Sequence, residues 1–447
     1  MGDQERCMCS CDVSADANCH SSCSKEPNGN QLARNTMTQL NPRLPTMAYT
    51  GEAGNIFTWT PAQSRKQQLT WSWEEQHRVL SEQAVAGGRL THIWPTWAPD
   101  GSRIVCFGVR GTGKDTVETS VFSVAADGIE SWELTGLAGK MPIYGNWSPR
   151  GDAFAALVQR GEHALSLEII RFDGLGKTIP LISGAPLFWS WSPHGDRLAV
   201  HVGGSRRASA AARVVIVDAK SGQTVTVVTD RPGEFRVPAW APHEDLLAYV
   251  EQDTHGQDTL MLLDVATGEK GMVTTGEGGT AAVWSPDGKI LAFAHAARPG
   301  ASLFAPVRTV DLASGKMETL LEAPVVGFFW SPQNEALWYV SLDSGRSYLR
   351  WHRFLRSSGE TTELARFLPS REQMFVLSFF DQYTLSHPPL APDGKTLAFS
   401  GYLLNPAGSA AAAHVYVLSL EDGAEPRPVA TGDFVCWNLN DPLLGPV

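Results

Sequence analysis

The stretch of sequence that decides the fold is Trp284-Ser285-Pro286-Asp287-Gly288-Lys289-Ile290-Leu291-Ala292-Phe293. It combines an aromatic residue, a Ser-Pro pair, an Asp-Gly pair and a short apolar run. Proline presets φ and glycine accepts a positive φ, so the central residues predict a tight turn. Apolar residues lie on both sides of that turn, and they predict two short strands that it joins.

The same pattern recurs along the chain, and successive copies start between 44 and 60 residues apart. The copies start at Leu40, Trp97, Trp147, Trp191, Trp240, Trp284, Trp330 and Leu390, and a truncated last copy contains Trp437. Each interval has room for four short strands. Four antiparallel strands in about 40–50 residues form one blade of a β-propeller. Because a single blade cannot bury both of its faces, we expect the blades to stack in a ring.

The two ends of the repeat region predict how the ring closes. The first copy, at residues 40–70, has a poor inner strand, whereas residues 434–437 are predicted to form an inner strand that no further strand follows. Pairing the two segments completes one blade and removes free strand edges. We therefore predict an all-β, eight-bladed propeller of four-stranded antiparallel blades over residues 37–447. The count is seven if the first copy is an appendage, and residues 1–36 are predicted to be a disordered tail.

The W-S-P-D-G-x-x-L-A-F signature resembles the WD40-like repeat of TolB-type propellers, and it covers residues 40–447. It is also similar to repeats in the propeller domains of the dipeptidyl peptidase IV and prolyl oligopeptidase families. The resemblance implies a fold but not a function. TolB is periplasmic and has an α/β domain ahead of its propeller, whereas no export signal is visible in this sequence. No Gly-x-Ser-x-Gly motif is present, so the hydrolase activity of the peptidases is not implied.

The composition narrows the function classes. Hydrophobic residues make up 43% of the chain, and 36 basic against 47 acidic residues give a formal net charge of −11. This charge argues against a nucleic-acid partner. The sequence lacks the run of about 18 apolar residues that a membrane span needs. We expect a cytoplasmic, monomeric protein.

Residues 379–387 are the candidate ligand site, because they carry polar groups where other repeats have small or apolar ones. We interpret it as the start of an inner strand that faces the central channel. There Asp381 can fix a polar ligand, and His387 can titrate near neutral pH. The alternative is that these groups bond to backbone at the strand start. The candidate ligand- or partner-binding residues are Asp381, Gln382, Tyr383, His387, Trp94, Tyr144 and Arg236.

Two crossings between repeats are enlarged and favour a partner site on one face. Each contains a possible helix start, Ser72 with Glu75 in the first crossing and Ser370 with Gln373 in the second. Both lie on the face that carries the loops between second and third strands and the crossings to the next blade. These loops vary in length, and function tends to reside on such loops. The alternative is that the helices only shield the ring from water.

The N-terminal tail is a separate candidate for metal binding. Five of the seven cysteines lie in the first 23 residues, next to a histidine. Thiolates and an imidazole suit Zn²⁺ or Cu(I), but the C-x-C-x-C spacing differs from that of common structural zinc sites. The candidate ligands are Cys7, Cys9, Cys11, Cys19, His20 and Cys23; the alternative is an unstructured tail without a cofactor.

Three functions are therefore compatible with the sequence. The first is a non-enzymatic scaffold that binds a protein or peptide partner on the variable-loop face. The second is an enzyme or small-ligand binder that uses the channel around Asp381, Tyr383 and His387. The third is metal handling by the N-terminal cysteines. No residue is singled out as catalytic, because no nucleophile paired with a base can be identified from spacing alone.

Overall fold

The computed structural model describes residues 44–441, apart from residues 72–89, 112–116, 138, 162–163, 173–177, 205–210, 235, 256, 299, 344–347, 404–411 and 422. The predicted cysteine-containing tail and the helix predicted after Ser72 lie outside the described residues. Everything described belongs to the compact unit that begins at Leu40.

The strands follow one another through the sheets in chain order. The first sheets contain β1 (Met47–Thr50), β2 (Ile56–Thr60) and β3 (Arg65–Gln68); β4 (Leu90–Trp97), β5 (Arg103–Gly111), β6 (Val117–Ala125) and β7 (Ser131–Gly136); and β8 (Lys140–Trp147), β9 (Ala153–Arg160), β10 (Ala164–Arg171) and β11 (Thr178–Ser183). The next contain β12 (Leu187–Trp191), β13 (Arg197–Val202), β14 (Arg213–Asp218) and β15 (Thr224–Thr229); β16 (Ala239–Trp240), β17 (Leu246–Gln252), β18 (Asp258–Asp264) and β19 (Lys270–Gly276); and β20 (Thr280–Trp284), β21 (Ile290–His295), β22 (Val307–Asp311) and β23 (Met317–Leu321). The last contain β24 (Gly327–Trp330), β25 (Ala336–Leu342), β26 (Leu349–Leu355) and β27 (Thr361–Pro369), then β28 (Thr396–Leu403), β29 (His414–Ser419) and β30 (Arg427–Thr431), and finally β31 (Phe434–Trp437).

The described strands form six four-stranded antiparallel sheets and one seven-stranded sheet. The seven-stranded sheet arises because β27 pairs with β28, from Phe367 opposite Leu403 to Pro369 opposite Gly401. The predicted all-β propeller of antiparallel blades is confirmed. The count of eight stays a prediction, because it depends on dividing this sheet between β27 and β28.

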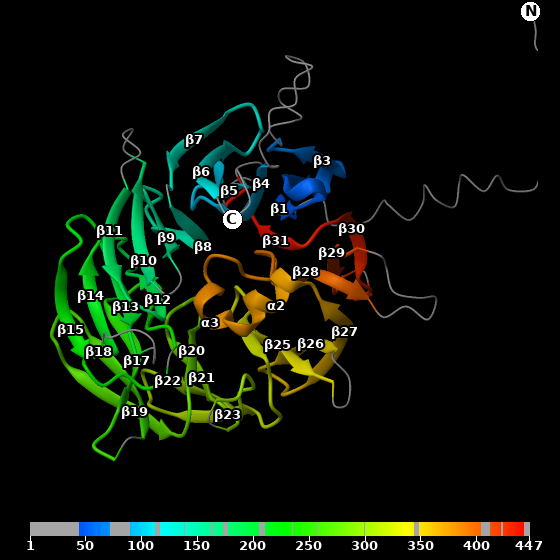
Figure 1. Cartoon of the computed structure of the whole chain (residues 1–447). Helices are drawn as coiled ribbons and strands as arrows, with labels where there is room; N and C mark the ends of the chain where they lie inside the picture. The colour runs from blue at the N-terminus through cyan, green and yellow to red at the C-terminus, as the bar shows by residue number, and fades with distance from the viewer. Residues whose placement is uncertain are drawn as a thin grey trace, which may run out of the picture. The chain divides into compact units, whose positions relative to one another are not determined.

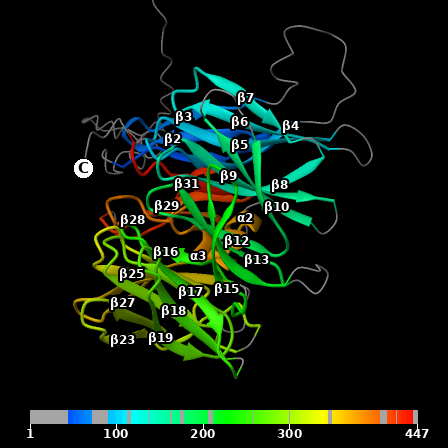
Figure 2. The ribbon, with the colours of Figure 1, turned by 90° about the vertical axis from the view of Figure 1, so that its left-hand side faces the viewer.

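The sheets follow one another around a central helical segment. Figure 1 shows α2 (Arg371–Ser378) and α3 (Phe380–Tyr383) inside the ring of sheets, with β7, β11, β15, β19 and β23 on its outside. In the view of Figure 2, turned by 90°, the two helices again lie among the inner strands. The sequence predicted the ring but left its centre as an open channel.

The ring closes as predicted. The last strand β31 pairs with β1, from Met47 opposite Trp437 to Thr50 opposite Phe434. β1 also pairs with β2, and β2 with β3, so the two chain ends share one four-stranded sheet. This pairing covers the edge of β1 that would otherwise be free and makes β31 the innermost strand of the sheet.

The motif residues after each tryptophan build the predicted turn. In the third repeat the Ser148 hydroxyl is buried and donates to Asp152, while the amide of Gly151 donates to the Ser148 carbonyl. Gly151 has a φ of 71°, a conformation that favours glycine. In the seventh repeat Asn334 holds the equivalent position with a φ of 62°, because asparagine tolerates this region best among the other residues.

The repeat tryptophans link neighbouring blades. Six of the seven repeat tryptophans that the structure describes, all but Trp240, donate their indole N–H to the residue that directly precedes the motif tryptophan, or its equivalent, in the previous repeat. Backbone carbonyls accept these bonds at 3.0–3.3 Å in the pairs Trp97–Cys436, Trp147–Thr96, Trp284–Ala239, Trp330–Val283 and Trp437–Pro389. Trp191 instead donates to the side-chain oxygen of Asn146 at 3.1 Å. The motif tryptophan therefore packs between blades and also bonds across the junction.

Candidate functional site

The segment predicted to start an inner strand is helical, so that prediction was wrong. Residues 371–378 form α2 and residues 380–383 form α3. The buried residues Gln373, Val376, Leu377 and Phe380 recur at the three- and four-residue spacing of a helix face. The helix start predicted at Ser370 is confirmed, because its hydroxyl accepts from the Gln373 amide at 3.1 Å. In the repeat that starts at Leu390, the expected inner strand is reduced to an isolated bridge between Leu390 and Leu397.

Gln382 attaches α3 to the opposite side of the ring. Its side-chain nitrogen donates to the Trp189 carbonyl at 2.8 Å, and its side-chain oxygen accepts from the Trp189 amide at 3.2 Å. The amide group thus satisfies both backbone groups of a residue on the inner strand β12, as a neighbouring strand would. Gln382 is 5% exposed, and these bonds give it a structural role.

His387 is buried and held in one orientation. Its Nε2 bonds to the Pro95 carbonyl at 3.1 Å, its Nδ1 contacts the Ser386 hydroxyl at 2.9 Å, and its ring lies 4.9 Å from Trp94. Burial lowers the pKa of His387 to about 4. The prediction that His387 titrates near neutral pH was therefore wrong, because the charged form loses its hydration in this environment.

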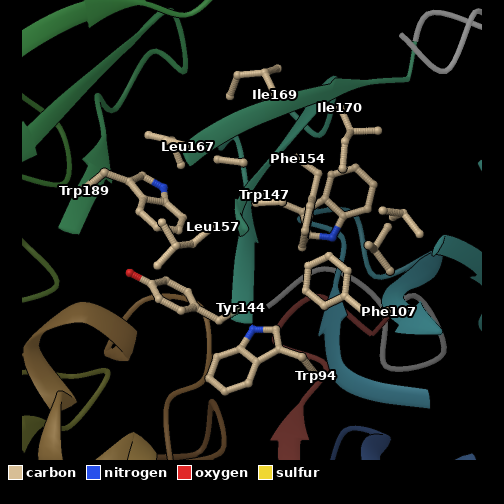
Figure 3. Packing of buried hydrophobic residues seen from close by; sticks show 14 of the residues in the cluster. Trp94, Phe107, Tyr144, Trp147, Phe154, Leu157, Leu167, Ile169, Ile170 and Trp189 are labelled. Carbon is tan, nitrogen blue, oxygen red and sulfur yellow. The ribbon is translucent and has the colours of Figure 1, made fainter. Parts of the chain in front are cut away.

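Trp94, Tyr144 and Tyr383 belong to one aromatic cluster at the centre of the ring. Figure 3 shows Trp94, Tyr144 and Trp189 side by side, although they come from three different sheets. Tyr144 stacks on Trp189 with centroids 4.7 Å apart, and Tyr383 meets Tyr144 edge-on at 5.0 Å. The Trp94 indole donates to the Gly145 carbonyl at 3.0 Å. These side chains pack the centre, and burial raises the pKa of both tyrosines well above the ordinary value.

Arg236 and Asp381 form a buried ion pair. Arg236 Nη1 lies 3.4 Å from Asp381 Oδ1, and its guanidinium lies 4.5 Å from the centre of the Phe304 ring. Burial raises the pKa of Asp381, and the Arg236 charge opposes that rise. The second carboxylate oxygen, Oδ2, is buried and has no hydrogen-bond partner in the described part of the chain. The sequence named both residues but gave no reason to pair them.

A cavity of about 390 Å³ lies at one end of the central channel. Its wall includes six repeat tryptophans: Trp97, Trp147, Trp191, Trp240, Trp284 and Trp437. Prolines that follow four of them complete the wall: Pro99, Pro149, Pro193 and Pro242. Its base includes Asp381, Gln382, Thr384, Leu385 and Ser386. Leu385 is 69% exposed there.

The cavity lies on the side where the inner strands end and the motif turns begin. Trp97 ends β4 and Trp147 ends β8, and the wall continues into the turns that follow them. This is opposite to the variable-loop face that the sequence favoured. Of the seven predicted binding residues, only Asp381 and Gln382 line the cavity. The repeat tryptophans were not among the predicted site residues, and only their position at the same end of each inner strand could have pointed to a shared wall.

The contact between Ser386 and His387 is a weak basis for catalysis. Ser386 lines the cavity and lies within hydrogen-bond distance of a ring nitrogen. The imidazole, however, has a pKa of about 4 and therefore takes a proton poorly at neutral pH. Its ring nitrogens contact Ser386, Thr96 and Pro95, none of which carries a negative charge that would stabilise an imidazolium.

Two further properties of the described residues concern metals and membranes. No cluster of three or more histidine, cysteine, aspartate or glutamate side chains is positioned there to hold a metal ion. The two cysteines that the structure describes, Cys106 and Cys436, are buried and unpaired. None of the described helices has the length and apolar character needed to cross a bilayer.

Sequence comparisons find no match. No protein-family model matches this chain, and neither does any curated protein sequence.

Structure comparison gives many matches. Dipeptidyl peptidase 4 from Porphyromonas gingivalis aligns with a TM-score of 0.55 at 11% identity, over 91% of this chain and 62% of that one. The propeller fold is shared. A puromycin hydrolase mutant aligns at 0.42 and 18% identity, over 67% of this chain and 50% of that one. TolB from Acinetobacter baumannii aligns at 0.38 and 16% identity, over 75% and 83%. This chain thus spans half of the hydrolase and 62% of the peptidase.

The comparison confirms the fold that the repeat signature implied. At 11% identity the likeness to dipeptidyl peptidase 4 speaks for the fold alone. The function has to be argued from the cavity and from the residues that line it.

Proposed function

We propose that this chain is a binding protein rather than an enzyme, and that its cavity holds a segment of a protein or peptide partner. The observation that carries the proposal is the convergence of six repeat tryptophans on one cavity whose base is formed by α3 and the residues after it. Concave, mostly apolar pockets on rigid frames are the usual form of a binding site.

The wall of this cavity is fixed before a ligand arrives. Five of its six tryptophans donate their indole N–H to the neighbouring repeat, so their rings are held in place. A preformed wall lowers the ordering cost that binding must overcome. An apolar side chain fully buried against it contributes about 1.5–3 kcal/mol. Leu385 adds an exposed apolar surface at the base.

The proposal moves the partner site to the face opposite the one predicted from the sequence. The enlarged crossing at residues 365–390 still matters, because it supplies the base of the cavity. Catalysis by Ser386 and His387 is disfavoured by the low pKa of the imidazole. Metal binding by the N-terminal cysteines, the cytoplasmic location and the monomeric state stay predictions.

A peptide library selected against the full chain tests this proposal. Leu385→Arg places a long charged side chain at the base of the cavity, and we expect it to weaken binding of selected peptides at least about tenfold. Leu342→Arg is the matched control, because Leu342 is 47% exposed and lies at the end of β25, outside the cavity wall. Peptides that bind the Leu385→Arg variant as tightly as the wild type would overturn the proposal.

A further inference from the structure

The cavity presents mainly apolar groups to a ligand. Leu385 is 69% exposed and Leu439 is 39% exposed, and both line the cavity. The prolines of the wall have no N–H, and five of its six tryptophans already donate their indole N–H to the neighbouring repeat. The part of a partner that enters the cavity is therefore best apolar, because the wall offers few hydrogen-bond donors to a polar group.

The turns around the cavity have a different character, because they are acidic. Five motif turns adjoin the cavity, since each follows a tryptophan of its wall: residues 98–102, 148–152, 192–196, 241–245 and 285–289. Together they contain two basic residues, Arg150 and Lys289. They contain six acidic residues, none of them buried: Asp100, Asp152, Asp196, Glu244, Asp245 and Asp287.

Basic side chains balance only part of this charge. Arg197, the first residue of β13, lies 3.8 Å from Asp196. Lys289 lies 3.9 Å from Asp287. Once these two pairs are set aside, four acidic residues of the five turns face a single basic residue, Arg150. The turns therefore carry an excess of negative charge.

Neutral groups hold two of the remaining carboxylates. The Ser102 hydroxyl donates to Asp100 at 2.8 Å, and the buried Ser148 hydroxyl donates to Asp152 at 2.7 Å. Hydrogen bonds of this kind orient a carboxylate and leave its charge in place. Arg103 follows the first of these turns, but its guanidinium lies 5.6 Å from the centre of an aromatic ring on the outer strand β7.

The second turn of the blade extends the acidic surface outward. It joins the third and fourth strands, so in an antiparallel blade it lies at the same end as the motif turn. Hydrogen bonds from hydroxyls and amides of these turns lower the pKa of Asp218, Asp264 and Asp311, so these carboxylates are charged at neutral pH. Four repeats have an aspartate in this turn or directly before it: Asp127, Asp218, Asp264 and Asp311.

We propose that the cavity binds an apolar segment of a protein partner that has lysine or arginine residues on one or both sides. The apolar side chains lie against Leu385 and the tryptophan wall, and the flanking cations lie over the acidic turns. Complementary charge speeds the encounter and discriminates against other partners. The inference rests on the proposed function, because it names the class of segment that the cavity holds.

The first test reads the charge of the peptides that a random library yields when it is selected against the full chain. The unselected library gives the reference composition. We expect the bound peptides to combine an apolar run with flanks of net charge about +2 or more, since a basic flank complements the turns and an acidic flank is repelled by them.

Two triple variants then locate the attraction. The turn variant removes three exposed charges beside the cavity and keeps an amide oxygen at each position: Asp100→Asn, Asp152→Asn and Glu244→Gln. The matched control removes three exposed charges from loops at the other end of the strands: Glu52→Gln, Glu277→Gln and Glu322→Gln. At about 0.01 M salt we expect the turn variant to bind a selected basic peptide about fivefold more weakly, and the control to change affinity less than about twofold. At about 1 M salt the difference between the two variants disappears.

A reciprocal measurement uses the wild-type chain and does not depend on the folding of a variant. Replacing the lysines and arginines of the selected peptide by glutamine should weaken its binding about fivefold at low salt. Circular dichroism verifies that both triple variants are folded. Leu385→Gln accompanies Leu385→Arg, because it removes the apolar contact without adding a positive charge that would itself repel a basic peptide.

Several outcomes overturn the inference. These are selected peptides with neutral or acidic flanks, a wild-type affinity that does not change when the basic residues become glutamine, or equal losses in the two triple variants. Equal losses would mean that the net charge of the whole protein attracts the peptide, without a role for the turns. A selection that yields no peptide overturns the proposed function and the inference together. Peptides that bind Leu385→Gln and Leu385→Arg weakly but have no basic excess refute the inference alone.

Discussion

At the junction between β4 and β8, Trp147 donates its indole N–H to the Thr96 carbonyl at 3.2 Å. At the junction before the last repeat, Leu390 holds the equivalent position and has no group to donate. This second junction is held differently, by pairing of β27 with β28 and by the helices α2 and α3. The helices reach across the ring, where Phe380 packs on Phe328 at 4.8 Å and Gln382 binds Trp189.

The difference separates two tasks of the same fold. The regular junctions repeat one small interaction and give the ring its stability. The junction before Leu390 lacks the indole hydrogen bond to the previous repeat. The segment inserted there, which contains α2 and α3, supplies the base of the cavity, including Asp381 and Leu385. The cavity that we propose as the binding site therefore has its base at a break in the repeat, while regular repeats form its wall.

The largest effect is expected where a regular junction also closes the ring. Trp437 is 2% exposed, lies on β31 and donates to the Pro389 carbonyl at 3.0 Å. Trp437→Ala should lower the free energy of unfolding by about 4 kcal/mol, because it leaves a cavity at the closing strand. Urea unfolding measures the loss. Trp132→Ala is the control, since Trp132 on β7 is 38% exposed, and equal losses in the two variants would contradict the prediction.

The irregular junction should make stability depend on pH through His387. The ordinary pKa of 6.5 applies to the unfolded chain, whereas the folded value is about 4. Between these values the unfolded state binds a proton that the folded state does not, so stability falls as the pH falls and levels off below about 4. The substitution His387→Gln removes the contribution of His387 to the pH dependence of stability.

Unfolding titrations at several pH values test that prediction. Going from pH 7 to pH 4, the wild type should lose about 3 kcal/mol more than His387→Gln does. Other buried groups, including His92 and His201, whose pKa values burial also lowers to about 4, contribute equally to both proteins. Parallel pH profiles for the two proteins would show that His387 is protonated as easily in the fold as outside it.

The regular part of the ring could be predicted from the sequence because its signals are local. The turn needs glycine, the strand needs an apolar run, and both recur with the tryptophan at each repeat. The pairing of β31 with β1 followed from the missing inner strand of the first repeat. The irregular part was misjudged at residues 380–383, where a strand was expected and α3 forms.

The residues at the base of the cavity lie in the segment that was wrongly predicted as a strand. A strand would have sent alternate side chains to opposite faces, whereas a helix rotates each residue by about 100°. Asp381 and Gln382 therefore reach the cavity, while Tyr383 packs into the aromatic cluster. The unused indole of Trp240 could not be predicted either. Its local sequence, Trp-Ala-Pro, matches that of Trp97, and only the three-dimensional neighbours show that its N–H lacks an acceptor.

Removal of Gln382 should loosen the helices from the far side of the ring. Gln382→Leu leaves the amide and carbonyl of Trp189 buried without partners, and we expect a loss of about 2 kcal/mol in the free energy of unfolding. Gln333→Leu is the control, because its bond to the Pro392 carbonyl lies in an exposed turn. A loss no greater than that of the control would mean that the helices are held by apolar packing alone.

The smallest effect distinguishes tryptophans that link repeats from the one that does not. Trp330→Phe removes a buried bond to the Val283 carbonyl at 3.1 Å and should cost about 1 kcal/mol. Trp240→Phe removes an N–H that has no acceptor in the described structure, so the free energy of unfolding without ligand should change by less than about 0.5 kcal/mol. Both variants lose the same atoms, and denaturant unfolding compares them directly. Equal losses would show that Trp240 links its repeat like the others.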